Sequence, residues 1–237
     1  MRAAFSFLTA FGGSRTPSRS TFVWFPLVGV VIGLVVGSAW WVASRWWAPS
    51  LAGAIALVVD LAVTGLLHVD GLADAGDGLI APLTRERRLE VMTDPSVGAF
   101  GVISVVAVLL VRWGALASSR PAPLVVAGLW CAARTVMVLI SEVLAYARPG
   151  GLVSSFLSTQ GGARRAVWAS MSLGGVGAIW LVASGGLRGV EALCGELVAM
   201  AAVATLSWRR IGGYTGDVLG ASGVVGETVG LVVWALR

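Results

Sequence analysis

Seven long apolar segments restrict most strongly what this chain can fold into. They lie roughly at residues 22–43, 51–67, 99–118, 122–145, 166–184, 190–207 and 217–236. A helix needs about 20 such residues to cross the hydrocarbon core of a bilayer. Charged side chains make up only 12% of the chain, about half of the fraction in a soluble domain. We therefore expect an all-α integral membrane protein, with residues 1–237 forming a single bundle of about 6–7 transmembrane helices and cytoplasmic catalytic loops.

The arginines predict how these segments are oriented. The N-terminal tail and the loops at about 68–98, 146–165 and 208–216 together carry eleven arginines, and the opposite side carries four. Cytoplasmic loops are rich in basic residues, so this pattern predicts a multi-pass protein of the cell inner (plasma) membrane with a cytoplasmic N-terminus. Lipid is then the surrounding partner, and the sequence is compatible with an oligomer. Nucleic acid is not an expected partner, because no basic stripe with interleaved aromatic residues stands outside the membrane segments.

Carboxylates gather at the end of the second apolar segment. Residues 68–78 hold the only histidine of the chain and three of its six aspartates, Asp70, Asp74 and Asp77. In a helix these positions share one face, where like charges repel unless a cation lies among them. Oxygen ligands favour a hard ion, Mg2+ or Mn2+, and Mg2+ is usually bound together with substrate phosphate. The alternative is an ordinary helix end solvated by the cytoplasm.

His68 does not fit the same helical face. On a continuous helix it would point about 160° away from Asp70. Either the helix begins or breaks near Gly71, or His68 has a separate role, such as packing at the membrane interface.

Basic residues follow the carboxylates, with Arg85, Arg87 and Arg88 preceding Asp94-Pro95. Arginine suits phosphate oxygens, although basic residues beside a membrane segment are also ordinary topology signals. Asp94 either caps the next helix or joins a metal site.

A second cluster of glycine and aspartate, Gly212–Gly220, is expected on the same side of the membrane. A glycine-rich turn entering a helix can present backbone N–H groups to phosphate, whereas Asp217 is also explained as a helix cap.

Charged residues inside the predicted segments include Asp60, Arg112, Arg134 and Glu142. Charges are costly in lipid, so these side chains should face the bundle interior or water. Structural ion pairing among them and a functional role both stay open.

Three motifs together resemble the cobalamin synthase family, the adenosylcobinamide-GDP ribazoletransferases. They are His-x-Asp-Gly-Leu-Ala-Asp-x-x-Asp-Gly at His68 to Gly78, Met-x-Asp-x-x-x-Gly-x-x-Gly at Met92 to Gly101, and Gly-Gly-Tyr-Thr-Gly-Asp-x-Leu-Gly at Gly212 to Gly220. Phe7-Leu8-Thr9 and Phe25-Pro26-Leu27-Val28-Gly29 are also similar to that family, so the resemblance covers nearly the entire chain in order. The chain departs from the family at Asp94-Pro95-Ser96, where a more polar, basic stretch is common.

The resemblance implies a membrane transferase of cobalamin biosynthesis. Such an enzyme joins alpha-ribazole, or its 5'-phosphate, to adenosylcobinamide-GDP and releases GMP. The family implies Mg2+, or Mn2+ in its place, held by Asp70, Asp74, Asp77 and Asp217, with one of the first three aspartates or His68 accepting the hydroxyl proton. The residues expected to contact the substrates are Arg85, Arg88, Asp94, Arg165, Gly213, Tyr214 and Thr215.

Two other functions are alternatives to the cobalamin synthase interpretation. CDP-alcohol phosphatidyltransferases also use clustered aspartates with Mg2+, but Asp74 stands where their motif has arginine, and the later pair of aspartates is missing. A cation-coupled transporter would use buried Asp60, Arg134 and Glu142, and would be expected to show repeated halves. The sequence shows no such repeat.

Overall fold

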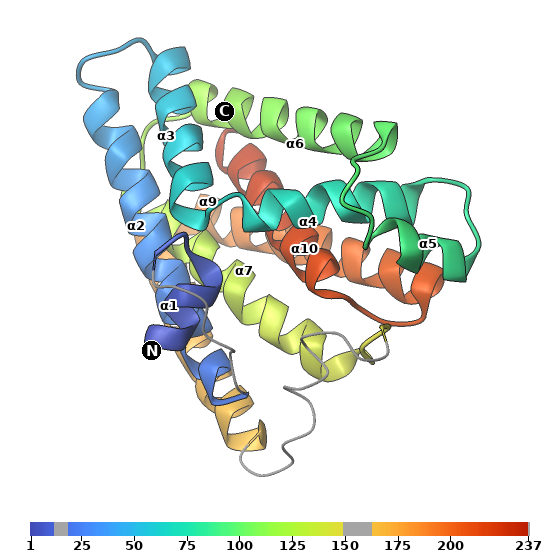
Figure 1. The fold of residues 1–237 in the computed structure, drawn as a ribbon. Helices are drawn as coiled ribbons and strands as arrows, with labels where there is room; N and C mark the ends of the chain where they lie inside the picture. The colour runs from blue at the N-terminus through green and yellow to red at the C-terminus, as the bar shows by residue number, and fades with distance from the viewer. Residues whose placement is uncertain (12–18, 149–162, 237) are drawn as a thin grey trace.

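The computed structural model describes residues 1–11, 19–148 and 163–236, with only the backbone of residues 19–20 and 163–166. Helices make up this part of the chain, and one isolated β-bridge joins Tyr146 to Tyr214. The elements are α1 (Arg2–Leu8), the 3-10 helix η1 (Arg19–Trp24), α2 (Phe25–Ala43), α3 (Pro49–Thr64), α4 (Leu67–Ala75), the π-helix η2 (Gly76–Ile80), α5 (Arg85–Val91), α6 (Ala99–Ser118), α7 (Pro123–Val143), α9 (Ala163–Ile211) and α10 (Gly216–Trp234). Figure 1 shows α2 and α3 side by side, with α4 and α6 extending away from this pair toward the right of the view.

Five described helices are long and apolar enough to cross a membrane: Thr21–Ala43, Ala99–Ser118, Pro123–Val143, Val167–Ile211 and Gly216–Trp234. A sixth crossing is added if the bent pair Pro49–Thr64 and Leu67–Ile80 forms one span. The predicted all-α integral membrane fold is confirmed, and the protein is a multi-pass membrane protein.

Helix α9 corresponds to two predicted segments, 166–184 and 190–207. Gly186 interrupts it with φ 58° and ψ −143°, a conformation that glycine tolerates and other residues rarely adopt. A Cβ atom added at Gly189 would lie only 2.6 Å from the carbonyl oxygen of Leu181. Residues eight apart in a straight helix are separated by about 12 Å, so the chain turns sharply here. The two predicted segments are therefore the two arms of one interrupted helix.

A second break separates α3 from α4. Gly65 and Leu66 have φ values of 61° and 62°, and the two helices are bent by 92°. Left-handed backbone ends α3 at Thr64, and the strained Leu66 starts α4 in a new direction. The predicted segment 51–67 was therefore too long at its end. The break also means that the carboxylates of α4 do not continue the helical face of α3.

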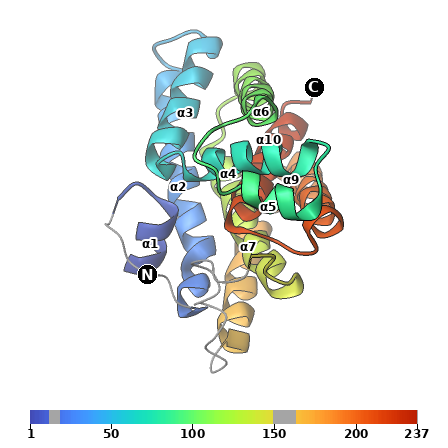
Figure 2. The ribbon, with the colours of Figure 1, turned by 45° about the vertical axis from the view of Figure 1, so that its right-hand side comes forward.

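Helix α4 packs closely against α10, as Figures 1 and 2 both show. A Cβ atom at Gly71 would lie 2.9 Å from the carbonyl oxygen of Asp217, and one at Gly220 would lie 3.2 Å from the Cα atom of His68. Glycine at these two positions lets the backbones approach more closely than larger residues would allow. The contact brings the first and third sequence motifs together.

A buried ion network joins α3, α6, α7 and α10. Arg112 donates to Asp60 at 2.5 Å and to Glu227 at 2.9 Å, while Arg134 donates to the other oxygen of Glu227 at 2.5 Å. These four side chains are at most 7% exposed. Trp130 also donates to Asp60, at 3.0 Å. Structural ion pairing is therefore the observed arrangement for three of the predicted intramembrane charges.

Glu142 does not join this network, and its exposed side chain agrees with the alternative that it faces water. Glu227 is the residue that pairs with both arginines. Glu142 lies in the last turn of α7, whereas Glu227 lies well inside α10. Glu196 of α9 is also fully buried and interacts electrostatically with Glu227.

Candidate active site

Asp70 and Asp74 lie one turn apart on α4, as their spacing predicts. Asp70 is exposed and Asp74 is half-buried. Asp74 is repelled by the carboxylates of Asp217, Asp70 and Asp77, and it is attracted by Arg148. The helix, the π-turn and the start of α10 thus concentrate negative charge around Asp74.

Asp77 is buried in the π-helix that follows α4, and it anchors the N-terminus of α6. Its two carboxylate oxygens accept hydrogen bonds from the backbone N–H groups of Gly98, at 2.6 Å, and Gly101, at 2.9 Å. Unpaired N–H groups at a helix N-terminus favour a negative charge. A Cβ atom at Gly98 or Gly101 would lie 2.5 Å from an Asp77 oxygen, so both glycines are needed for this contact. Gly98 and Gly101 of the second motif thereby position Asp77, the third aspartate of the first motif.

Asp217 enters the cluster from the first turn of α10. Thr215 is the N-cap of this helix, and its hydroxyl oxygen accepts a hydrogen bond from Val218 N–H at 3.3 Å. The hydroxyl of Thr215 also donates to Asp217 at 3.2 Å. Because Gly71 allows close backbone approach, this helix start faces the carboxylates of α4.

The turn before α10 is held by the segment that follows α7. Tyr214 N–H donates to the carbonyl oxygen of Ala145 at 2.9 Å, and Ala147 N–H donates to that of Tyr214 at 2.8 Å. A Cβ atom at Gly213 would lie 2.0 Å from the same Ala145 oxygen. Gly213, Tyr214 and Thr215, all predicted to bind substrate, are buried in this turn. The structure shows them positioning Asp217 and the chain around Ala147.

Arg148 is the residue of the site that the sequence did not single out. Its Nη2 atom donates to Asp217 at 2.8 Å and to the carbonyl oxygen of Met92 at 2.8 Å. The sequence signals only a basic residue in a predicted cytoplasmic loop, because the pairing with Tyr214 that places it here is non-local. The predicted loop regions at about 68–98 and 146–165 therefore contribute residues to this cluster, and Asp217 joins it from the position directly after the region at 208–216.

Two predicted phosphate-binding arginines hold backbone carbonyl groups. Arg88 is buried and donates to the carbonyl oxygens of Gly78 at 2.7 Å and Leu79 at 3.1 Å. The exposed Arg85 donates through Nε to the carbonyl oxygen of Ile211 at 2.9 Å. Arg165 lies in the first turn of α9, and its side chain is outside the described part of the structure.

Asp94 lies on the surface, before α6. Its Oδ1 atom accepts a hydrogen bond from Ser96 N–H at 2.8 Å. Hydrogen bonds from Ser96 hold the pKa of Asp94 below its usual value. Gly98 is the N-cap residue of α6, and Asp77 supplies the carboxylate at that helix end. The cap role suggested for Asp94 is therefore filled by two other residues.

His68 is buried on the side of α4 that meets α10, where Gly220 lies against its backbone. Its Nδ1 atom is buried and has no hydrogen-bond partner in the part of the chain that the structure describes. Charged groups that interact with it include Arg134 and Arg112 of the buried ion network. The helix breaks at Gly65 and Leu66 and not near Gly71, so His68 lies on a different side of α4 from the carboxylates.

The carboxylate cluster fits a magnesium ion bound jointly with a phosphorylated substrate. Within the described residues, no three histidine, cysteine or acidic side chains are placed to hold a metal ion by themselves. Mg2+ usually retains water and binds one or two carboxylates together with substrate phosphates, so it does not need an all-protein cage. Asp74 and Asp217 supply such a pair from facing helices, with Asp70 beside them.

Comparison with known proteins gives the family. The family model of cobalamin-5-phosphate synthase matches residues 1–235. The chain belongs to the cobalamin-5-phosphate synthase family. A relative from Prosthecochloris aestuarii, named adenosylcobinamide-GDP ribazoletransferase, is 36% identical over 92% of this chain and 86% of its own length. A relative of the same name from Chlorobaculum tepidum is 39% identical over 92% of this chain and 85% of its own length.

The resemblance drawn from the three motifs is thereby confirmed. A third relative with that name, from Bradyrhizobium diazoefficiens, is 36% identical over 99% of this chain and 92% of its own length. No solved structure matches. As a member of the cobalamin-5-phosphate synthase family, the chain is a membrane transferase of cobalamin biosynthesis.

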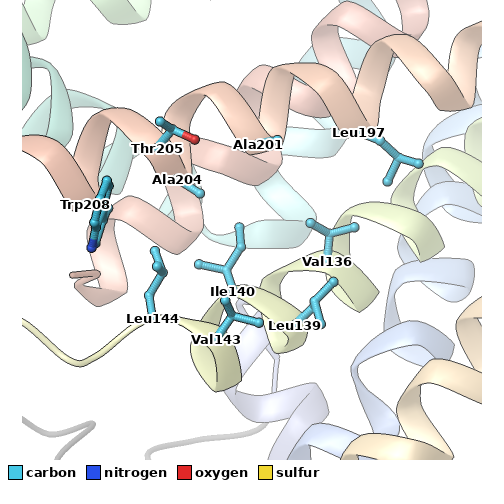
Figure 3. A pocket seen from close by; sticks show the side chains of 10 residues that line it. All are labelled: Val136, Leu139, Ile140, Val143, Leu144, Leu197, Ala201, Ala204, Thr205 and Trp208. Atoms are coloured by element: carbon cyan, nitrogen blue, oxygen red, sulfur yellow. The ribbon is translucent and has the colours of Figure 1, made fainter.

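An apolar groove of about 360 Å³ lies between α7 and α9 of this synthase-family chain. Figure 3 shows side chains of both helices facing each other across it, among them Ile140, Leu144 and Trp208. Its lining contains no titratable side chain. The groove therefore cannot supply the charged groups that phosphoryl transfer needs, and the carboxylates of α4 and α10 are the candidate site for the chemistry.

The close contact at Gly71 gives a direct test of this site geometry. Gly71→Ala places a methyl group 2.9 Å from the carbonyl oxygen of Asp217, which pushes α10 away from α4. We expect the free energy of unfolding to fall by about 1–3 kcal/mol, and activity to fall with it. Unfolding in a denaturing detergent, measured by circular dichroism, checks the first effect.

Gly114→Ala is the matched control, because nothing lies within 4 Å of a Cβ atom at that position of α6. Alanine favours helix over glycine, so this variant should be at least as stable as the native chain. Equal stability of the two variants would show that α4 and α10 are not held in close contact at Gly71.

Proposed function

We propose that this protein transfers the adenosylcobinamide phosphate of adenosylcobinamide-GDP to alpha-ribazole or its 5'-phosphate. GMP is released, and adenosylcobalamin or its 5'-phosphate is formed. The observation that carries the proposal is the convergence of Asp70 and Asp74 from α4 with Asp217 from α10, in a chain of the cobalamin-5-phosphate synthase family. The name of the relatives, adenosylcobinamide-GDP ribazoletransferase, supports the choice of substrates.

The reaction is a phosphoryl transfer. A ribose hydroxyl attacks the phosphorus atom attached to the cobinamide arm, the new phosphorus–oxygen bond forms, and the bond to GMP breaks with its electron pair leaving on GMP. Such reactions need alignment and charge neutralisation more than covalent help from the protein. Mg2+, or Mn2+ in its place, neutralises charge on the phosphates when it is bound. Asp74, Asp217 and Asp70 would hold it.

The remaining residues of the site position these groups and move a proton. Asp77 keeps the end of α4 fixed against α6, since both of its oxygens are bonded to that helix. A carboxylate of the cluster accepts the hydroxyl proton, and the exposed Asp70 is accessible for this task. His68, the other residue suggested by the sequence, lies toward α10 and the buried arginines.

The orientation of the protein is part of the proposal. We place the carboxylate cluster and the N-terminus at the cytoplasmic face of the inner membrane, because three arginine-rich regions meet near the cluster. The positive-inside rule supports this placement.

A reconstituted reaction tests the function. Detergent-purified protein is incubated with adenosylcobinamide-GDP, alpha-ribazole and Mg2+, and GMP and the corrinoid product are separated by chromatography. We expect GMP and cobalamin to form in equal amounts, and EDTA to stop both. Folded protein that forms neither product with alpha-ribazole or its 5'-phosphate would overturn the proposal.

A further inference from the structure

Arg148 is fixed at the carboxylate cluster by its backbone neighbours. The β-bridge between Tyr146 and Tyr214 and the hydrogen bond from Ala147 N–H to the carbonyl oxygen of Tyr214 hold the chain just before it. Its side chain then reaches the end of α5 at Met92 and the start of α10 at Asp217. Three segments distant in the sequence therefore meet at one guanidinium group.

The guanidinium group of Arg148 is only partly used by the protein. Both of its hydrogen bonds to described residues come from Nη2, and Nε is buried with no hydrogen-bond partner among those residues. The side chain is 20% exposed, so the group also reaches the surface of the cluster. Arginine has five N–H donors in a planar fork, which can bind a carboxylate and a phosphate oxygen at the same time.

The negative charge around Arg148 favours a guanidinium group at this position. Asp74 interacts with three other carboxylates, and Arg148 is the cation that reduces this repulsion. A diphosphate brings further negative charge to the same place. Arg85 and Arg88 donate to backbone carbonyl oxygens elsewhere, so neither is placed as Arg148 is.

We propose that Arg148 binds the diphosphate of the nucleotide substrate, with Nη2 on Asp217 and Nη1 on a phosphate oxygen. This role rests on the proposed function and adds to it the residue that recognises the phosphate. Arg148 also orients Asp217, so one side chain links the carboxylate on α10 to the substrate. A purely structural clamp would stabilise the fold without affecting the affinity for phosphate.

Inorganic pyrophosphate is the probe that separates these two roles. Its binding to the detergent-purified protein is measured by calorimetry with excess Mg2+, for the native chain and for Arg148→Lys and Arg148→Gln. Lysine keeps the charge opposite Asp217 but loses the planar fork, so it keeps the fold. We expect the dissociation constant to rise about 10- to 100-fold in Arg148→Gln, and by a smaller factor in Arg148→Lys.

Arg87→Gln is the control, because Arg87 lies on the surface of α5 and pairs only with the exposed Glu90 in the described structure. It should bind pyrophosphate as the native chain does. Native affinity in Arg148→Lys, or equal weakening in Arg87→Gln, would overturn the proposal. If Arg148→Gln does not fold, Arg148→Lys decides between the two roles.

The same measurement distinguishes this inference from the proposed reaction. If the native protein forms cobalamin while Arg148→Lys binds pyrophosphate normally, the reaction stands and the role of Arg148 falls. If no cobalamin forms while the Arg148 variants lose pyrophosphate, the phosphate site stands and the proposed reaction falls. A raised KM for adenosylcobinamide-GDP in Arg148→Lys, with unchanged thermal stability, would further support phosphate recognition.

Discussion

Replacing Asp74 with asparagine is expected to lower the turnover rate by about 10²- to 10³-fold. Asparagine keeps the shape of the side chain and removes the negative charge that would hold a divalent cation against the substrate phosphates. Loss of one such preorganised group costs about 2.7–4 kcal/mol of transition-state stabilisation in well-studied enzymes. Activity is followed as GMP release under saturating Mg2+.

The same substitution should leave the protein at least as stable as the native chain. Asp74 is repelled by Asp217, Asp70 and Asp77, so removal of its charge relieves repulsion in the folded state. A structural aspartate would give the opposite result, with lower stability and proportionally lower activity. Glu86→Gln, on the exposed surface of α5, is the control for loss of a negative charge. Native activity in Asp74→Asn would remove this residue from the site.

Replacing Glu227 with glutamine should destabilise the fold by about 3–5 kcal/mol. Glu227 pairs with both Arg112 and Arg134, and all three side chains are at most 2% exposed. The substitution would leave two buried guanidinium groups, and within the described residues only Arg112 keeps an ion pair, with Asp60. Breaking a buried pair from one side is costly because the remaining charge cannot be solvated.

Detergent-induced unfolding measures this effect, and Glu142→Gln is its matched control. Glu142 is exposed, so its charge can be removed with little change in stability. If Glu227→Gln and Glu142→Gln unfolded at the same detergent concentration, the buried network would not stabilise the helix packing.

Local spacing in the sequence predicted much of the site. Asp70 and Asp74 share a helical face because they lie one turn apart, and the long apolar runs predicted the membrane fold. The two arms of α9 were also visible as separate apolar segments. These features depend on residues close together in the chain, where helical periodicity determines which side chains meet.

The contacts that complete the site are non-local, so spacing could not predict them. Asp77 was grouped with the other carboxylates, but its oxygens are bonded to Gly98 and Gly101 of α6. Arg88 was read as a phosphate ligand from its charge alone, whereas it is buried against Gly78 and Leu79. Arg148 was not predicted to be part of the site, because only the pairing of its segment with Tyr214 brings it to the carboxylate cluster.

The sequence also did not predict the position of the break between α3 and α4. The sequence left two alternatives open, a helix that begins or breaks near Gly71 or a separate role for His68. The chain instead turns at Gly65 and Leu66, and Gly71 serves the contact with α10. Glycine in a membrane helix marks either a turn or a close approach of two backbones, and the sequence alone does not distinguish them.

Binding of Mn2+ most directly tests the claim that the carboxylates of α4 and α10 hold a cation with the substrate. Free and bound Mn2+ are separated by electron paramagnetic resonance, using detergent-purified protein with adenosylcobinamide-GDP present. We predict bound Mn2+ that Mg2+ displaces, and an affinity for Mn2+ at least about tenfold weaker in both Asp74→Asn and Asp217→Asn. Equal Mn2+ affinity in the native protein and both variants would contradict it.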